Sequence, residues 1–169
     1  MTTIRTDRLL LETLTLDEAR AITALDRVGR GWVADYPSEG DLIVAGIVCE
    51  AGEHYDESAE FGILQVRLAA SGDAVGGLGF IHQPEGGAVE VGYGLAESAR
   101  GQGYATEALR GLLAWAAGHR VHVVVAMTAI DNLASQRVLD RLGFTPAAEA
   151  VDEGGDDGPM LRWEHAIGV

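Results

Sequence analysis

The chain has 169 residues, of which 47% are hydrophobic, and this length and composition fit one domain with a sizeable core. Its formal net charge of −14 leaves no surplus of positive charge to neutralise phosphates, so we expect no nucleic-acid partner. No apolar run reaches transmembrane length, and we expect no secretory signal. The single cysteine, Cys49, excludes an internal disulfide. We therefore expect a single domain over residues 1–169, in a reducing cytoplasm and without a membrane partner.

The first part of the chain predicts a strand followed by two helices. Residues 8–14 are apolar with partial alternation, which is typical of a strand. A capping-box pattern over 15–18 predicts the start of a helix that runs to about Val28. Ser38 begins a second predicted helix that ends near Glu53, although the β-branched residues in this stretch would also suit a strand.

The middle of the chain predicts an antiparallel meander. Strands are expected over 61–69, 75–82 and 89–95. The stretches 71–73 and 84–87 carry the glycine and proline residues that are typical of turns. These three strands should therefore lie side by side in one sheet.

A loop with two glycines leads from this meander into the longest predicted helix. Gly101 and Gly103 lie where the loop becomes the helix, and glycine lets a backbone approach a ligand closely. The first amides of a helix have no partner within it and carry a partial positive charge. We therefore expect a phosphate-bearing ligand at this helix start. The predicted core stripe of the helix is Ala105, Leu109, Leu112, Leu113 and Ala116.

The last third of the chain predicts a buried strand, a short helix and a hairpin. Residues 121–127 are nearly all apolar, as in a strand that is buried on both faces. A helix is expected over 132–142, and 144–151 should pair with 160–166. The core face of that helix is predicted as Ala134, Val138 and Leu142. Together these elements predict an α/β fold, with a mixed sheet and helices on both faces.

The glycine loop fails two common phosphate-binding patterns. A P-loop ends in Gly-Lys-Ser or Gly-Lys-Thr, which this sequence lacks. A dinucleotide fingerprint needs a third glycine where Thr106 stands. The remaining pattern is Arg100-x-x-Gly103-x-Ala105.

This pattern resembles the acyl-CoA pyrophosphate loop of the GCN5-related N-acetyltransferase (GNAT) family. The resemblance continues through 104–109, through Asn132 and Ser135, and through the Leu-Gly-Phe sequence at 142–144. The stretches 6–11 and 91–95 resemble the ribosomal-protein alanine acetyltransferase (RimJ/RimL-like) branch. The resemblance covers nearly the whole chain. It implies the GNAT fold, with a mostly antiparallel sheet that contains a splayed strand pair.

The resemblance also implies that acetyl-CoA is the co-substrate. The cofactor-binding residues that it implies are Tyr93, Gly94, Leu95, Arg100, Gly101, Gln102, Gly103, Tyr104, Ala105 and Asn132. The backbone of residues 93–95 would pair with the pantetheine arm, and an amide there would face the thioester oxygen. For Asn132, an ordinary helix N-cap is the alternative.

Acetyl transfer requires an uncharged amine, so a base or a water chain must take its proton. The resemblance makes Glu90 the candidate base, with a solvent-facing position as the alternative, and His82 and His122 are rivals. Ser135 would protonate or hydrogen-bond the leaving thiolate; the alternative is a bond back to its own helix.

Trp32, Tyr36 and the acidic stretch 152–157 lie where the family forms its acceptor mouth. Aromatic rings and carboxylates suit a cationic amine, although core packing is the alternative for Trp32. The acceptor would be a protein or peptide N-terminus or a small amine. No histidine spacing typical of a metal site is present, so we expect no metal. A non-catalytic acyl-CoA-binding sensor or scaffold is the alternative function, and the resemblance leaves a homodimer open.

Overall fold

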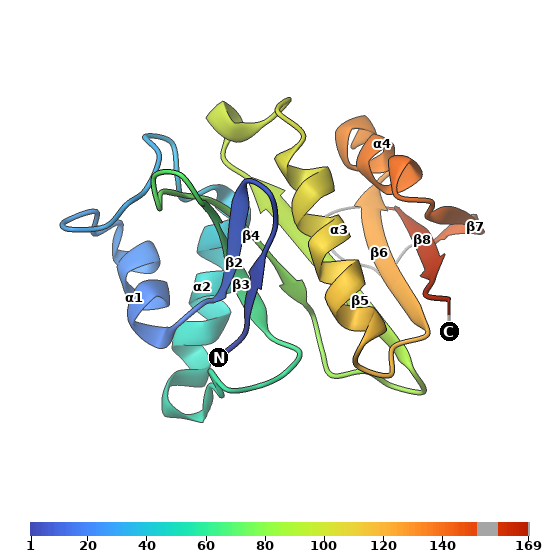
Figure 1. Ribbon diagram of the computed structural model, residues 1–169, viewed down its shortest axis with the longest axis horizontal. Helices are drawn as coiled ribbons and strands as arrows, with labels where there is room; N and C mark the ends of the chain where they lie inside the picture. Colours follow the sequence, from blue (N-terminus) through green and yellow to red (C-terminus); the bar gives the residue numbers. More distant parts are fainter. Residues whose placement is uncertain (152–158, 169) are drawn as a thin grey trace.

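The computed structural model describes residues 1–151 and 159–168, and for residues 148–151 it describes the backbone alone. The central feature of the fold is an eight-stranded sheet with helices on both faces (Figure 1). The elements in chain order are β1 (Thr3–Arg5), β2 (Leu9–Thr13), α1 (Leu16–Ala24), α2 (Glu39–Ala51), the 3₁₀ helix η1 (Gly52–His54), β3 (Ile63–Leu68), β4 (Ala74–Phe80), β5 (Ala88–Leu95), the 3₁₀ helix η2 (Glu97–Ala99), α3 (Tyr104–Ala117), β6 (Val123–Ala129), α4 (Leu133–Arg141), β7 (Thr145–Val151) and β8 (Met160–Ala166). The predicted α/β class is confirmed.

The sheet is mixed but mostly antiparallel. Its strand order is β1-β2-β3-β4-β5-β6-β8-β7, and all neighbours are antiparallel except β5 and β6. The predicted meander is β3-β4-β5, and the predicted final hairpin is β7-β8. The parallel pair is joined through α3, as a parallel connection requires a crossover.

The β5–β6 pair separates halfway along its length. Residues 88–91 of β5 pair with 123–126 of β6. Beyond Val91, β5 continues only with β4, and β6 continues only with β8. The two strands therefore splay apart, and the backbone of residues 92–95 borders an opening in the sheet.

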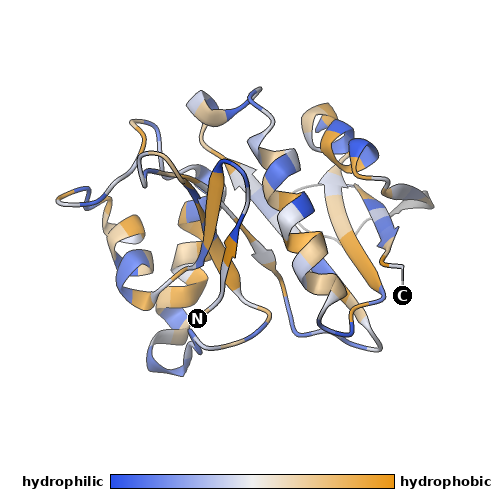
Figure 2. Cartoon of the chain, in the orientation of Figure 1, coloured by the Kyte–Doolittle hydropathy of each residue, from blue (hydrophilic) through white to orange (hydrophobic). Residues whose placement is uncertain are grey.

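Each face of the sheet has its own hydrophobic core. On one face α3 buries a stripe against the strands, and Figure 2 shows hydrophobic colour along β2 and β6 beside this helix. The buried residues of α3 are Ala108, Leu109, Leu112, Leu113 and Ala116. A second core lies among α1, α2 and the loop that joins them, so α1 and α2 cover the other face.

Two helices differ from the predictions in informative ways. The first helix ends at Ala24 rather than near Val28, because Leu25 adopts a left-handed conformation at φ 53° and its amide bonds back to the last turn. In α4 the fully buried residue is Leu139, whereas Ala134 is exposed. Ala134 borders a cavity instead of the core, whereas Val138 lines that cavity and also packs against the core, as Leu142 does.

Candidate active site

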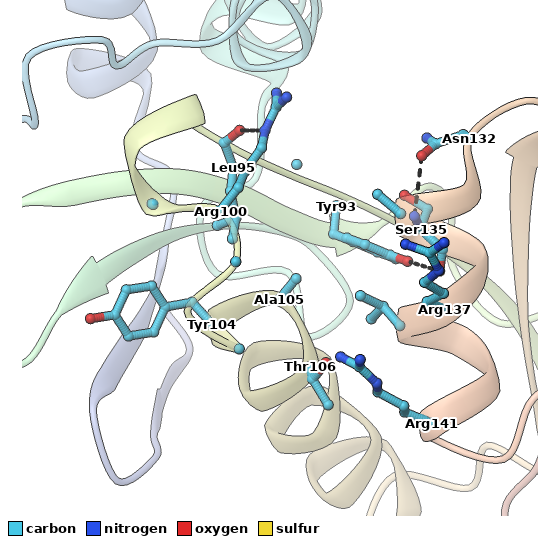
Figure 3. A pocket seen from close by; sticks show the side chains of 16 residues that line it. Tyr93, Leu95, Arg100, Tyr104, Ala105, Thr106, Asn132, Ser135, Arg137 and Arg141 are labelled. Atoms are coloured by element: carbon cyan, nitrogen blue, oxygen red, sulfur yellow. Dashed lines mark hydrogen bonds between the residues drawn. The ribbon is translucent and has the colours of Figure 1, made fainter.

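A cavity of about 440 Å³ lies where β5 leaves β6. Its walls are the end of β5, the loop before α3, the first turn of α3 and one face of α4 (Figure 3). Nine of the ten predicted cofactor-binding residues line it, and they are Tyr93, Gly94, Leu95, Arg100, Gly101, Gly103, Tyr104, Ala105 and Asn132. Ser135 lines it as well. The structure thus brings together residues from three separate elements.

The glycine loop places the start of α3 at this cavity. Gly101 and Gly103 have φ values of 75° and 81°, a left-handed backbone that side-chain-bearing residues resist. Gly103 is the N-cap of α3, and no side chain hydrogen-bonds the cap in the described structure. The first amides of α3 are therefore available to an anion, and the helix dipole adds to the attraction.

A clamp from the N-terminus holds this loop. The Arg8 guanidinium lies 4.6 Å from the centre of the Tyr104 ring, and its Nη1 donates to the Gln102 carbonyl at 3.1 Å. The Tyr104 ring therefore points away from the cavity, as Figure 3 shows. Gln102 does not line the cavity; its side-chain amide donates to the Ser98 carbonyl at 3.1 Å. The role of Arg8 was not predicted, because its partners lie about a hundred residues away along the chain.

Three arginines supply positive charge to the cavity. Arg100 is held by a 3.1 Å hydrogen bond from its Nε to the Leu95 carbonyl, and Arg137 and Arg141 extend from α4 (Figure 3). The chain has no lysine, so all 12 basic residues are arginines, and three of them meet here against a net charge of −14. Arginine suits phosphate because its planar group donates two parallel hydrogen bonds. The four-residue spacing of Arg137 and Arg141 in one predicted helix indicates that both lie on the same helix face, but it was not used to predict this site.

A second cavity of about 250 Å³ continues between the splayed strands, and Tyr93, Asn132 and Ser135 line both cavities. The Asn132 side chain accepts the Ser135 amide at 3.1 Å, so Asn132 is the N-cap of α4 while it also borders the opening. The Tyr93 hydroxyl donates to the Ser135 carbonyl at 3.2 Å. Burial raises the pKa of Tyr93, so its phenol keeps its proton at neutral pH. This phenol beside Ser135 was not predicted.

Glu90 is on β5 but lines neither of these cavities. It alternates with the buried residues Val89 and Val91, so its half-buried side chain lies on the α2 face of the sheet. His82 is exposed beyond the end of β4, and His122 precedes β6 at the end away from the opening. Neither histidine is close in the fold to the splayed part of β5.

Trp32 and Tyr36 lie in the second core rather than at a mouth. They are only 8% and 2% exposed. Trp32 Nε1 donates to Glu18 at 2.7 Å, and Gln65 donates to the Tyr36 hydroxyl at 2.9 Å. Because buried partners satisfy their polar atoms, these aromatic residues are stable inside the protein, and both show the core packing that was the alternative for Trp32. The other part of the predicted mouth, 152–157, lies outside the described residues.

Within residues 1–151 and 159–168, no group of three or more histidine, cysteine, aspartate or glutamate side chains is arranged to hold a metal ion. Over the same part of the chain, no helix is long and apolar enough to cross a membrane.

The splayed sheet, the uncapped helix start and the arginines define a protein built to hold an extended, phosphate-bearing ligand. Residues 8–145 match the model of the acetyltransferase (GNAT) domain, so the chain belongs to the GNAT acetyltransferase family. The resemblance inferred from the glycine loop is thereby confirmed.

Individual relatives agree with this family. The chain is 40% identical over 74 residues to the uncharacterized N-acetyltransferase YjdG of Bacillus subtilis (strain 168), a match that spans 43% of this chain and only 44% of that protein. An acetyltransferase structure from Agrobacterium tumefaciens str. C58 is 27% identical, with a TM-score of 0.68 and coverage of 98% of this chain and 94% of that one. RimL, a ribosomal L7/L12 alpha-N-protein acetyltransferase solved with coenzyme A, shares the fold at 21% identity, with a TM-score of 0.68 and 98% coverage of both chains.

Proposed function

We propose that the protein is an N-acetyltransferase, which moves the acetyl group of acetyl-CoA to a primary amine by direct attack in a ternary complex. One observation carries this proposal: the uncapped start of α3 and three arginines share a single cavity with the splayed end of β5. The cavity offers anion-binding groups at one end and free strand backbone at the other. Acetyl-CoA has the matching order of groups, with phosphates at one end and a thioester at the other.

The chain's own residues suggest how the co-substrate is held. The amides of residues 103–105 and the arginines would bind the phosphates. The backbone of residues 93–95 would pair with the pantetheine arm, because this part of β5 has lost β6 as a neighbour. The thioester would then lie in the smaller cavity, beside Tyr93 and Ser135.

The transfer would form one bond and break another. The amine nitrogen bonds to the thioester carbon, and the carbon–sulfur bond breaks. An amide at or beside Leu95 would stabilise the negative oxygen that develops. A base, for which Glu90 or a water chain are the candidates, would remove the amine proton, and the Ser135 hydroxyl would hydrogen-bond or protonate the thiolate.

The acceptor is proposed as a primary amine. RimL is a ribosomal L7/L12 alpha-N-protein acetyltransferase, so a protein N-terminus is one candidate, and a small amine is the other. All described strands belong to one sheet, which supports the proposal of a single domain. A homodimer is consistent with the proposal.

Release of free thiol from acetyl-CoA, measured over a panel of amines, tests the activity. We expect amine-dependent thiol release from the wild-type protein, and loss of release in a variant that no longer binds CoA. A protein that binds CoA but releases no thiol with any amine would contradict the proposal and favour the acyl-CoA sensor.

A further inference from the structure

A third cavity, of about 360 Å³, lies on the opposite face of β5 from α3, between the sheet and α2. Its floor has four glycines that pair across two strands, Gly77 with Gly94 and Gly79 with Gly92. The cavity shares Tyr93 and Gly94 with the cofactor cleft. The two cavities therefore meet across the backbone of β5, at the point where a thioester is proposed to lie.

Among the described residues, Asp41 is the one charged side chain that lines this cavity. It is 9% exposed, and its Oδ2 accepts the Ser38 amide at 2.9 Å and the Ser38 hydroxyl at 2.6 Å. Its Oδ1 lies against the glycine floor, since a Cβ atom built on Gly77 would be 2.9 Å away. Among the described residues Oδ1 accepts no hydrogen bond. Burial raises the pKa of this carboxyl group, and a nearby cation would oppose that shift.

We infer that this cavity binds the acceptor, and that the acceptor is a compact primary amine on a hydrocarbon body, with its ammonium group held by Asp41 Oδ1. The inference rests on the proposed acetyltransferase function. Gly77 pairs with Gly94, so an ammonium at Asp41 lies beside the strand segment proposed to hold the thioester. Glu90 lies four residues before Gly94 on β5, or about 13 Å from it at 3.3 Å per residue, so Asp41 is the carboxylate nearer to Gly94.

The mainly apolar walls of the cavity are the reason for inferring that the acceptor has a hydrocarbon body. Ile43, Ile47 and Ile81 stand at its rim with more than half of their surface exposed, and the remaining walls are mainly apolar. Tyr93 also lines the cavity, but its hydroxyl bonds to Ser135. A second charge, or the amide groups of a peptide, would be buried here without side-chain partners, which is costly. The cavity therefore selects an alkylamine over a diamine or a peptide N-terminus.

Two substitutions distinguish a role of this cavity in amine binding from a purely structural role of its residues. Asp41→Asn keeps an oxygen for both Ser38 hydrogen bonds but removes the charge, so α2 keeps its cap. Gly94→Ala adds a methyl group on the α2 face, and a Cβ there meets no atom within 4 Å. Glu39→Gln is the matched control, because Glu39 is exposed in the same first turn of α2 and does not line the cavity.

Two measurements test the inference. Calorimetry measures the binding of isoamylamine to the CoA-saturated protein. Thiol release from acetyl-CoA is measured with isoamylamine, putrescine and a tripeptide as acceptors. We expect isoamylamine to exceed the other two amines at least tenfold in kcat/KM. Asp41→Asn and Gly94→Ala should each weaken isoamylamine binding and raise its KM at least tenfold. In Asp41→Asn, CoA affinity should stay within twofold of wild type and the melting temperature within a few degrees. Glu39→Gln should match wild type.

Equal isoamylamine affinity in the wild type and in Asp41→Asn would overturn the inference, and so would equal use of putrescine or the tripeptide. Both results leave CoA binding and thiol release intact, so they are distinct from failure of the proposed function. Absence of CoA binding would overturn the proposed function, and this inference with it.

Discussion

The Glu107 carboxylate in the first turn of α3 is bound to Arg8 twice, through the Arg8 backbone amide and through Nε, each at 2.7 Å. The Thr6 hydroxyl adds a third hydrogen bond at 2.6 Å. Arg8 in turn donates to the Gln102 carbonyl in the glycine loop. The loop that borders the cofactor cleft is therefore held in place by the N-terminal hairpin.

Removing this contact should weaken CoA binding at a distance. In Glu107→Ala the half-buried Thr6 hydroxyl and the exposed Arg8 lose their acceptor, which costs about 1 kcal/mol of the free energy of unfolding. We expect lower CoA affinity by calorimetry and a lower midpoint in urea. Glu53→Ala, an exposed glutamate in η1, is the control. CoA affinity that is unchanged in Glu107→Ala would show that the clamp does not position the loop.

The buried glutamate Glu18 should make the protein sensitive to acid. Burial raises the pKa of Glu18, but hydrogen bonds from Trp32 and Gln65 and the charges of Arg67 and Arg30 outweigh it, so the pKa lies below its usual 4.5. A lowered pKa means that the ionised carboxylate stabilises the fold above pH 4.5, and that this stability is lost as pH falls through the folded-state value.

Urea unfolding of the wild type and of Glu18→Gln over a pH series tests this linkage. The variant should be less stable at neutral pH by about 2 kcal/mol, because the half-buried Arg30 and Arg67 lose their charged partner. Its stability should also fall less steeply than that of the wild type below pH 4.5. Parallel pH curves for the two proteins would contradict the assignment.

Much of the fold could be predicted because its signals are local. Gly118 and Gly143 mark the ends of helices, the capping box at Ser38 starts α2, and apolar runs mark the central strands. The strand β1 was missed because three residues carry no measurable periodicity. The end of α1 was missed because it depends on a left-handed leucine, Leu25, which no sequence rule favours.

Residues of the candidate site were predicted only where they lie close together in the sequence. Residues 100–105 and Asn132 form motifs, so they were found. Trp32 and Tyr36 were misplaced because their burial depends on Glu18 and Gln65, which are distant in sequence. Asp41 was predicted only to lie in the second helix, because its position over Gly77 depends on how α2 packs on the sheet.

The backbone of the glycine loop can be tested with a matched pair of variants. Gly103 has a φ of 81° at the cleft, and Gly86 has a φ of 57° in a turn away from it. Alanine at either position costs about 1 kcal/mol of stability. Only Gly103→Ala should also reduce CoA affinity, by more than tenfold in calorimetry, because it distorts the helix start. Equal effects of both variants on CoA binding would contradict this account of the loop.

The arginines of α4 should contribute to CoA affinity through charge. Arg137→Met and Arg141→Met should each cost about 1.5–3 kcal/mol of binding free energy if their hydrogen bonds to phosphate form. The loss should shrink as salt concentration rises, because salt weakens the contribution of exposed charges. Arg20→Met, on the exposed side of α1, removes the same charge away from the cleft and should leave CoA affinity unchanged.

Glu90 should affect turnover more than binding if it is the base. We expect Glu90→Gln to lower kcat and to change the pH–rate profile, while CoA affinity stays at the wild-type value, because Glu90 lies outside the cofactor cleft. A rate that is unchanged across the pH range would remove Glu90 from the mechanism. That result would leave a water chain, or another carboxylate, to take the proton.

The central claim is that the cleft between β5, α3 and α4 binds acetyl-CoA, and calorimetric titration of CoA into the wild-type protein tests it most directly. The account predicts saturable binding at one site per chain, with an affinity that falls in Gly103→Ala and in Arg141→Met. No binding at millimolar CoA would contradict it.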